Sequence, residues 1–434
     1  MSNTFCLYPF VNLNSNTEGS VKLCCSINEN LHVHSSDKKE LNFGTNSIEE
    51  IWNSEYMKNV RRQMLNGERP SACDVCWRLE DIGVQSSRQS AWQEFKHADY
   101  NLKEIKKVDP PLPSSLELRL GNFCNLRCNS CWSLSSDRIR DERHKLIKQQ
   151  SENDWLLEEW SKEVNLADQQ EWRWWENPTF LSTIEKLAPS LKRLYLTGGE
   201  PTLIAKNIEI MNYILDSGNT DCYIALTTNL TNYNEEFFNT MSKFKHGEIQ
   251  ISIDDVFERN HYIRYPTQWK HVEENIVKLY YKFPTNWIIK HYTVFQVYNY
   301  DNITNIIDWV KLHRSYHKAE SERVYIWSPI ILENPKYLDA RILPKANKNY
   351  VINKLSMYLN ENSEIDNTYW KHGLTQIVKF LESDFHTEEH AKELRKKFVH
   401  YNDTLDKSRK TDWRVTFDRL NKHIFELDKE KHEN

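Results

Sequence analysis

Three cysteines within eight residues have the spacing of an iron–sulfur site. They are Cys124, Cys128 and Cys131 in the segment Cys-Asn-Leu-Arg-Cys-Asn-Ser-Cys. A strand-like run precedes them, and the asparagines between them favour a loop over a helix. Three thiolates on one loop can hold three irons of a 4Fe-4S cube and leave the fourth iron open for chemistry. The alternative is a buried helical stripe, because offsets of four and seven also share one helix face.

A glycine pair follows the next strand-like run and indicates a second part of the same site. Gly198 and Gly199 are two of only ten glycines in the chain, and Glu200 and Pro201 come directly after them. Without side chains, the two glycines would expose backbone carbonyls to a close ligand, and the Glu200 carboxylate adds an acceptor. Alone, the segment is equally consistent with a tight turn that opens a helix.

Strand-like and helix-like segments alternate beyond residue 115, which predicts an α/β fold. Alternation of this kind favours parallel strands joined by crossover helices. Six strands predict a partial (β/α)6 barrel, similar to a TIM barrel but open on one side, with ligands at the carboxyl ends of the strands. The strand-like runs are 116–120, 194–197, 223–227, 249–253, 288–295 and 324–331.

The cysteine loop after the first strand and the Gly-Gly-Glu-Pro segment after the second resemble the radical S-adenosylmethionine (SAM) superfamily. The resemblance implies that the open iron binds the amino and carboxylate groups of SAM, and that Gly198 to Glu200 border its amino group. It further implies reductive cleavage of SAM to a 5′-deoxyadenosyl radical that abstracts hydrogen, with an external electron donor such as flavodoxin or ferredoxin. The family's third-strand motif often ends in glycine, where this chain has Leu230.

The resemblance also implies further contacts to SAM. Alternation directs Ser252 and Asp254 to one face, the barrel interior, and family members use comparable residues for the ribose hydroxyls. For Asp255 the ordinary alternative is a helix cap. We expect the SAM carboxylate to pair with Arg264 in preference to Arg259. The predicted SAM contacts are Gly198, Gly199, Glu200, Thr228, Asn229, Ser252, Asp254 and Arg264.

The N-terminal region holds a second set of cysteines. Four thiolates satisfy either tetrahedral zinc or a fully ligated iron–sulfur cluster, so the residue types alone leave both open. The order of the cysteines around the segment 43–52 resembles the SPASM/twitch auxiliary-cluster module, here placed before the barrel. The predicted ligands are Cys6, Cys24, Cys73 and Cys76, whereas Cys25 and Cys222 are predicted not to bind metal.

Three domains are expected along the chain. Prolines at 110, 111 and 113 indicate an extended connector, so we place the twitch-like domain at 1–108 and the barrel at 115–335. A helical insertion at about 133–190 carries tryptophans that we expect to pack rather than bind substrate. The region 336–434 is predicted to be helical, with an apolar stripe. The tryptophans are Trp155, Trp160, Trp172, Trp174 and Trp175, and the stripe is Trp413, Phe417, Leu420, Ile424 and Leu427.

Composition narrows the functional class. The chain has 57 basic and 62 acidic residues, so it lacks the global positive charge of a nucleic-acid-binding protein. No membrane-spanning or signal-like apolar run occurs, and nine cysteines then indicate a reducing, cytoplasmic location. We therefore expect a radical SAM enzyme. Its expected substrate is a peptide or protein, because relatives with auxiliary modules often modify peptides. The alternatives are a small-molecule or sugar substrate, or a non-enzymatic zinc–cysteine interaction protein.

Overall fold

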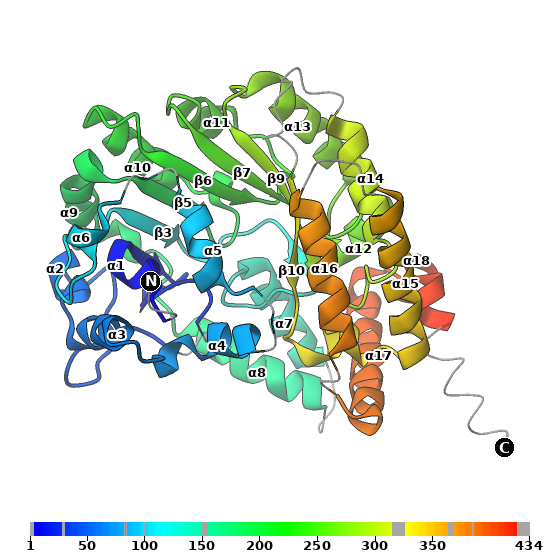
Figure 1. The fold of residues 1–434 in the computed structure, drawn as a ribbon. Helices are drawn as coiled ribbons and strands as arrows, with labels where there is room; N and C mark the ends of the chain where they lie inside the picture. Colours follow the sequence, from blue (N-terminus) through cyan, green and yellow to red (C-terminus); the bar gives the residue numbers. More distant parts are fainter. Residues whose placement is uncertain are drawn as a thin grey trace.

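One sheet organises the chain in the computed structural model (Figure 1). Its strands lie in the order β10-β9-β7-β6-β5-β3-β1-β2, and every neighbouring pair is parallel except β1 with β2. The strands are β1 Asn12–Ser15, β2 Val21–Lys22, β3 Ser115–Arg119, β5 Arg193–Thr197, β6 Tyr223–Thr228, β7 Gly247–Ser252, β9 Ile288–Phe295 and β10 Ile326–Ile331. The structure describes residues 4–27, 31–81, 83, 85–96, 98, 100–149, 154–314, 326–362, 368–383 and 386–422.

The predicted α/β fold is confirmed, because the six strand-like runs become the parallel strands β3, β5, β6, β7, β9 and β10. Residues 324 and 325 of the last run lie outside the described residues. Alternation gives the sheet two faces. In β3, Leu116 and Leu118 are buried in the apolar core, whereas Glu117 lies on the opposite face. Along the outer side run α10 Ala205–Asp216, α11 Glu235–Met241, α13 Trp269–Lys282 and α14 Ile303–Arg314 (Figure 1).

The opposite, inner face of the sheet is polar. The Tyr195 hydroxyl of β5 lies 2.7 Å from Thr227 Oγ1 of β6 and donates to Gln250 Oε1 of β7 at 2.9 Å. These contacts connect three neighbouring strands across their inner face. A core strand would place apolar side chains here, so the polar face indicates that the interior of the open barrel serves a ligand.

The N-terminal region extends this sheet. Strand β1 pairs with β3, placing Leu13 beside Leu116, so the sheet continues across the proline connector. Within this region, buried Arg61 of α3 donates to the carbonyls of Pro9 in α1 at 2.7 Å and Trp52 in α2 at 2.9 Å. Ser47 and Glu50 form a capping box at the start of α2. The helices are α1 Tyr8–Val11, α2 Ile48–Trp52, α3 Glu55–Leu65, α4 Asp74–Asp81, α5 Ser87–Glu94 and α6 Leu102–Ile105, and the domain boundary at 108–115 stays a prediction.

The insertion between β3 and β5 is helical, and most of its tryptophans pack. Trp160, Trp174 and Trp175 are buried, which confirms the packing interpretation for these three, while Trp155 and Trp172 are half-buried. Trp174 donates its ring N–H to the carbonyl of Thr17 at 2.9 Å, so the insertion is fastened to the N-terminal region. Its helices are α7 Asp137–Gln149, α8 Trp155–Asp168 and α9 Pro178–Leu187.

The C-terminal region is helical, as predicted, and packs against the barrel (Figure 1). Helix α16 lies on β10, where a side chain on Gly373 would meet the Pro329 ring at 2.5 Å. Trp413, Phe417 and Leu420 are buried, which confirms that part of the apolar stripe, whereas Ile424 and Leu427 lie outside the described residues. The helices are α15 Lys345–Glu361, α16 Thr368–Glu382, α17 Glu388–Arg409 and α18 Trp413–Thr416. None of the described helices is long and apolar enough to cross a membrane.

Candidate functional site

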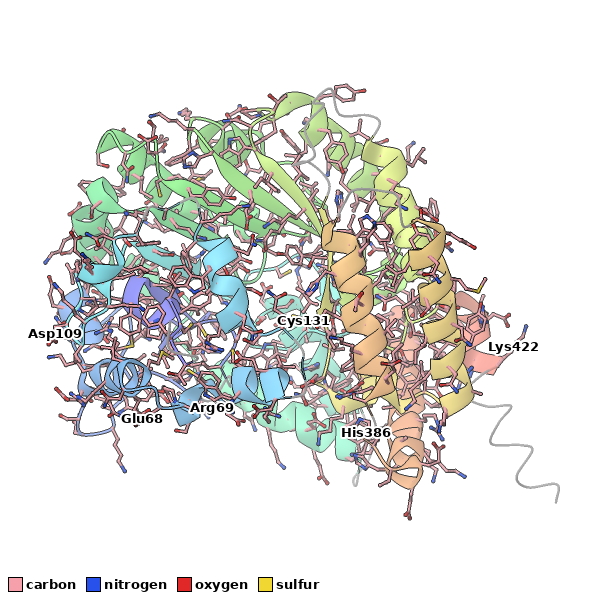
Figure 2. The ribbon with its side chains drawn as sticks, viewed as in Figure 1. Glu68, Arg69, Asp109, Cys131, His386 and Lys422 are labelled. Atoms are coloured by element: carbon pink, nitrogen blue, oxygen red, sulfur yellow. The ribbon has the colours of Figure 1, made fainter. Side chains whose placement is uncertain are left out.

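The three clustered cysteines lie on a loop that follows β3, near the centre of the molecule (Figure 2). Residues 121–136 form turns and the short strand β4 Arg127–Cys128, so the helical-stripe alternative is wrong. Strand β4 pairs with β8 Arg264–Tyr265, which sets Cys128 opposite Arg264. The Cys124 N–H donates to Asp137 Oδ1 at 3.1 Å, and the Cys131 N–H donates to the Cys128 carbonyl at 3.1 Å. The backbone of the loop is therefore fixed on both sides of Cys128.

Burial disfavours the thiolate form of these three cysteines when no metal is bound. It raises the pKa of all three above the ordinary cysteine value, to about 12 for Cys131. For Cys128 the next largest influence is the positive charge of Arg264, which lowers its pKa. Thiolate is the metal-binding form of cysteine, and cationic iron supplies the charge that buried thiolates need. The donor set therefore fits an iron–sulfur cluster bound at its three sulfurs.

The glycine pair packs directly on the cysteine loop. A Cβ at Gly199 would overlap the Phe123 carbonyl, and the Glu200 N–H donates to that same carbonyl at 2.7 Å. Gly198 adopts a φ of +120° and lies against the backbone of Arg119. That the backbone of these two glycines also borders SAM stays a prediction. Their missing side chains bring the end of β5 against the loop that holds the cysteines.

Glu200 is not a free acceptor, although the sequence predicts one. Its carboxylate accepts from the Thr228 hydroxyl and the Asn229 N–H, both at 2.7 Å, and from the Thr202 hydroxyl at 2.7 Å. Burial raises the pKa of Glu200, and these hydrogen bonds oppose that shift. Asn229 in turn donates to Asn125 Oδ1 of the cysteine loop at 2.9 Å. Glu200 thus joins the ends of β5 and β6 to the loop.

Leu230, which stands where the family often has glycine, has a φ of +49°. Glycine adopts this left-handed conformation without strain, so Leu230 has a glycine-like backbone conformation although it is not glycine. Thr228 Oγ1 accepts the Leu230 N–H at 3.0 Å and supports the turn.

Asp254 and Arg264, predicted to contact different parts of SAM, form one ion pair. Arg264 Nη1 lies 2.9 Å from Asp254 Oδ2, and the Val294 N–H donates to Asp254 Oδ1 at 2.8 Å. Asp254 has no exposed surface. Ser252 is half-buried on β7. The assignment of these side chains to SAM stays a prediction, but Asp254 now has a second role, which is to orient the cation beside Cys128.

Arg259, the less favoured candidate for the carboxylate, points into a separate network. Its guanidinium pairs with Asp255 at 2.7 Å and with Asp301 at 2.8 Å. Asp255 also accepts the N–H of Val256, just before α12 Phe257–Ile263. The N-cap residue of α12 is Val256 and no side chain caps this helix, so Asp255 is not the helix cap named as its alternative; it holds Arg259 instead.

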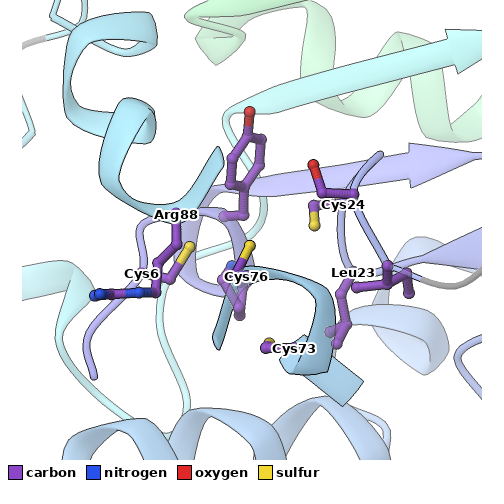
Figure 3. Close-up of a pocket in the computed structure, with 10 residues that line it drawn as sticks. Cys6, Leu23, Cys24, Cys73, Cys76 and Arg88 are labelled. Atoms are coloured by element: carbon purple, nitrogen blue, oxygen red, sulfur yellow. The ribbon is translucent and has the colours of Figure 1, made fainter. Parts of the chain in front are cut away.

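The four predicted N-terminal ligands line one cavity (Figure 3). Cys6 precedes α1, and Cys24 follows β2. Cys73 ends the 3-10 helix Ser71–Cys73 just before α4, and Cys76 lies in the first turn of α4. Burial raises the pKa of Cys73 to about 12. Four soft thiols around one cavity fit a fully ligated cluster. In the described part of the chain, no three histidine, cysteine or carboxylate groups lie close enough to hold a single metal ion.

The lining of the cavity includes Cys24 but neither of the two cysteines that are predicted not to bind metal. Cys25, next to Cys24 in the chain, is absent from its lining, and Cys222 is fully buried beside β6. Arg88 of α5 also lines the cavity, where it pairs with Glu80 and donates to the Phe5 carbonyl at 3.0 Å. This cation beside the thiols was not a sequence prediction, because no spacing rule connects Arg88 with Cys6.

Sequence reasoning also missed a group of residues on α17 that reach the cysteine loop. Tyr401 donates to the Asn129 carbonyl at 2.6 Å, and Arg409 donates to the Asn129 side chain at 2.6 Å. About 270 to 280 residues separate these partners, and no local pattern marks such a contact.

Comparison with known proteins identifies two family matches. Residues 118–310 match the radical SAM superfamily, and residues 6–77 match the SPASM iron–sulfur cluster-binding domain. The second match spans Cys6 to Cys76, so the SPASM domain precedes the barrel as predicted. No curated protein sequence matches the chain.

Solved structures show more distant similarity. Native anSMEcpe with bound AdoMet and Cp18Cys peptide is 15% identical with a TM-score of 0.36, and the match covers 57% of this chain but 60% of that one. Streptococcus suis SuiB is 10% identical with a TM-score of 0.37, covering 78% and 70%. TYW1 with a lysine-pyruvate adduct is 15% identical with a TM-score of 0.32, covering 64% and 85%. The match to anSMEcpe thus spans less than two thirds of that protein.

Proposed function

Because the chain belongs to the radical SAM superfamily and carries an N-terminal SPASM domain, we propose that it cleaves SAM reductively and modifies a peptide or protein. The observation that supports this most is the packing of the Gly198–Glu200 segment and Asn229 on the cysteine loop. Three strand ends meet there as one unit. A structural cysteine loop would not need the ends of two further strands.

In this proposal, Cys124, Cys128 and Cys131 hold the 4Fe-4S cluster. When bound, this cluster supplies the electron that splits SAM into methionine and a 5′-deoxyadenosyl radical, which takes hydrogen from the substrate. The chain's own residues position SAM. Arg264, fixed by Asp254, provides a positive charge beside Cys128. An external donor such as flavodoxin or ferredoxin provides the electron.

The auxiliary cluster is assigned to Cys6, Cys24, Cys73 and Cys76. Four thiolates complete its coordination, so we assign it to electron transfer or structural support rather than to direct substrate binding. The adjacent Arg88 supports this role, because a cation near the sulfurs favours the reduced, more negative cluster.

The decisive experiment is SAM cleavage by reconstituted protein with a chemical reductant under anaerobic conditions. We expect 5′-deoxyadenosine from the parent and none from the triple variant Cys124→Ala, Cys128→Ala and Cys131→Ala. Cys222→Ala is the matched control, because it also removes a buried thiol, and it should retain activity. Cleavage at the parental rate by the triple variant would refute the site. Zinc without sulfide in the parent would instead support the non-enzymatic interaction protein.

The substrate class needs its own test. A peptide is favoured because family members with auxiliary modules often modify peptides, and a small molecule or sugar is the rival. A cell extract separated by size distinguishes them, since substrate should stimulate 5′-deoxyadenosine formation. Stimulation confined to the peptide fraction, and abolished by protease treatment of that fraction, is the expected result. Stimulation by the small-molecule fraction alone would reject the peptide assignment.

A further inference from the structure

Helix α17 hydrogen-bonds the cysteine loop at Asn129. This residue lies between Cys128 and Cys131 and is only 2% exposed. The Tyr401 hydroxyl donates to its carbonyl at 2.6 Å, and Arg409 Nη1 donates to its side-chain Oδ1 at 2.6 Å. Both donors belong to α17, which lies outside both family matches.

The remaining polar groups of Asn129 are also paired. Its N–H donates to the Ile263 carbonyl at 2.8 Å, and its side-chain amide donates to the Tyr298 hydroxyl at 3.3 Å. Tyr298 then donates to Asn402 of α17 at 2.6 Å. Backbone donor, backbone acceptor, side-chain donor and side-chain acceptor are thus all engaged, so Asn129 cannot turn without breaking a buried hydrogen bond.

Arg409 connects this contact to the rest of the loop. Its guanidinium binds Glu142 of α7 through two bonds, Nε to Oε1 at 3.0 Å and Nη2 to Oε2 at 2.6 Å. Glu142 also accepts from Arg127, the residue before Cys128, at 3.0 Å. A forked guanidinium fixes direction as well as charge, and its third nitrogen is the one that reaches Asn129.

General helix packing does not account for these contacts. A helix that only covers the barrel would bury apolar side chains against it, as α16 does at Pro329. Helix α17 also buries apolar side chains such as Leu394 and Phe398, but its buried Arg409 and Tyr401 direct polar groups to the segment between two cysteines. Buried polar groups are expensive unless they are fully paired, and these are paired around Asn129.

We propose that α17 is a positioning element for the SAM-binding cluster and that Arg409 is its principal positioning residue. This inference rests on the proposed function, because it assumes that Cys128 and Cys131 hold the cluster. Arg409 fixes Asn129 and places a positive charge near the cluster. Loss of Arg409 should therefore lower the reduction potential, since the reduced cluster carries one more negative charge.

Two substitutions on the same helix test the proposal. Arg409→Met removes the cation at Asn129, whereas Arg395→Met removes a buried arginine that pairs with Glu388 and donates to the Ile342 carbonyl at 2.8 Å, remote from the loop contacts. The readouts are iron content, the reduction potential of the open cluster, and the change that SAM produces in its electron paramagnetic resonance spectrum. We expect Arg409→Met to lower the potential, blunt the SAM response and reduce SAM cleavage about 10- to 100-fold. Arg395→Met should keep the parental potential and SAM response.

A double variant separates positioning from charge balance. In Arg409→Met, the negative charge of Glu142 loses its arginine partner on α17. Adding Glu142→Gln removes that negative charge. We expect the double variant to regain thermal stability but not the parental SAM response, because Asn129 still lacks its donor. Complete restoration of the spectrum would overturn the positioning role. So would parental values in a folded Arg409→Met protein, or equal changes in Arg395→Met.

Tyr401→Phe provides the test if Arg409→Met fails to fold, because it deletes one hydroxyl from the same residue contact. It should alter the SAM response in the same direction, and an unchanged response would reject the proposal. Failure of the proposed function looks different. In that case the triple cysteine variant would keep all the iron of the parent, whatever Arg409 does.

Discussion

The two cysteine sites of this chain are built in opposite ways. The loop site takes its three cysteines from eight consecutive residues. Contacts with Asp137, with Arg264 of β8, and between Asn129 and α17 hold that segment in shape. The N-terminal site takes four cysteines from three separate segments around one cavity. A contiguous ligand set therefore depends on its neighbours for geometry, whereas a dispersed set is positioned by the fold of its own domain. The geometry of the loop site should therefore be sensitive to substitutions at remote residues, whereas metal binding at the N-terminal site should be coupled to folding of its domain.

The largest difference concerns which cluster responds to SAM. In the variant with Cys124, Cys128 and Cys131 all replaced by alanine, we expect about four irons per chain to remain in the auxiliary site. SAM should leave the spectrum of this cluster unchanged, because four thiolates saturate it. Iron and acid-labile sulfide analysis with spectroscopy provides the measurement. Zinc in this variant, with no sulfide, would contradict the auxiliary cluster and leave the loop assignment standing.

The next prediction compares two adjacent cysteines. Cys24→Ser should cost the auxiliary iron, and it should lower the melting temperature because metal binding and folding are coupled in a dispersed site. Cys25→Ser is the matched control, since Cys25 does not line the cavity, and its iron content should equal that of the parent. Iron loss in Cys25→Ser with retention in Cys24→Ser would reverse the assignment of the ligand.

At the loop site, the Asp254–Arg264 pair should show strong coupling. Replacing one partner leaves a mostly buried charge unpaired, so Arg264→Gln or Asp254→Asn alone should destabilise by about 3 to 5 kcal/mol. The double variant should cost less than the sum of the two in denaturant unfolding. SAM affinity should fall in Arg264→Gln, whereas Ser252→Ala should weaken it by about 1 kcal/mol. Additive effects on unfolding would show that the pair does not act as a unit.

A smaller effect is expected where β5 meets the loop. Gly199→Ala inserts a methyl group against the Phe123 carbonyl, which should cost about 1 to 3 kcal/mol and displace the loop. Gly373→Ala is a matched control, because its methyl group would overlap Pro329 at a contact between α16 and β10. Both variants should lose stability, but only Gly199→Ala should weaken SAM binding. Equal SAM affinity in the two would disprove a direct link between the glycine pair and the loop.

Local patterns predicted the parts of this protein that are local. Each barrel strand is a short, mainly apolar run, so β3, β5, β6, β7, β9 and β10 could be located without tertiary information. The choice of Cys24 over Cys25 followed spacing, and the cavity agrees with it. The packing of Gly199 and the hydrogen bonds to Glu200 could not be predicted. They depend on Phe123 and Asn229, which follow other strands of the sheet.

Long-range pairing explains what the sequence left open. Arg409 and Asn129 lie 280 residues apart, and each looks ordinary in its own segment. The same holds for β1, a four-residue strand whose addition to the sheet is specified by contact with β3 rather than by its own sequence. The contact of the C-terminal region with the cysteine loop could therefore not be predicted from motifs, although the helices themselves were predicted.

The contact between α16 and Pro329 has a consequence for how other chains approach this protein. Strand β10 ends the described sheet, and Ile330 beside Pro329 is 49% exposed, which would make a free edge prone to aggregation. Proline interrupts the row of backbone donors, and Gly373 lets a helix lie against it. The other end of the sheet is β2, only two residues long. Neither end of the described sheet is therefore a good template for strand addition by another chain.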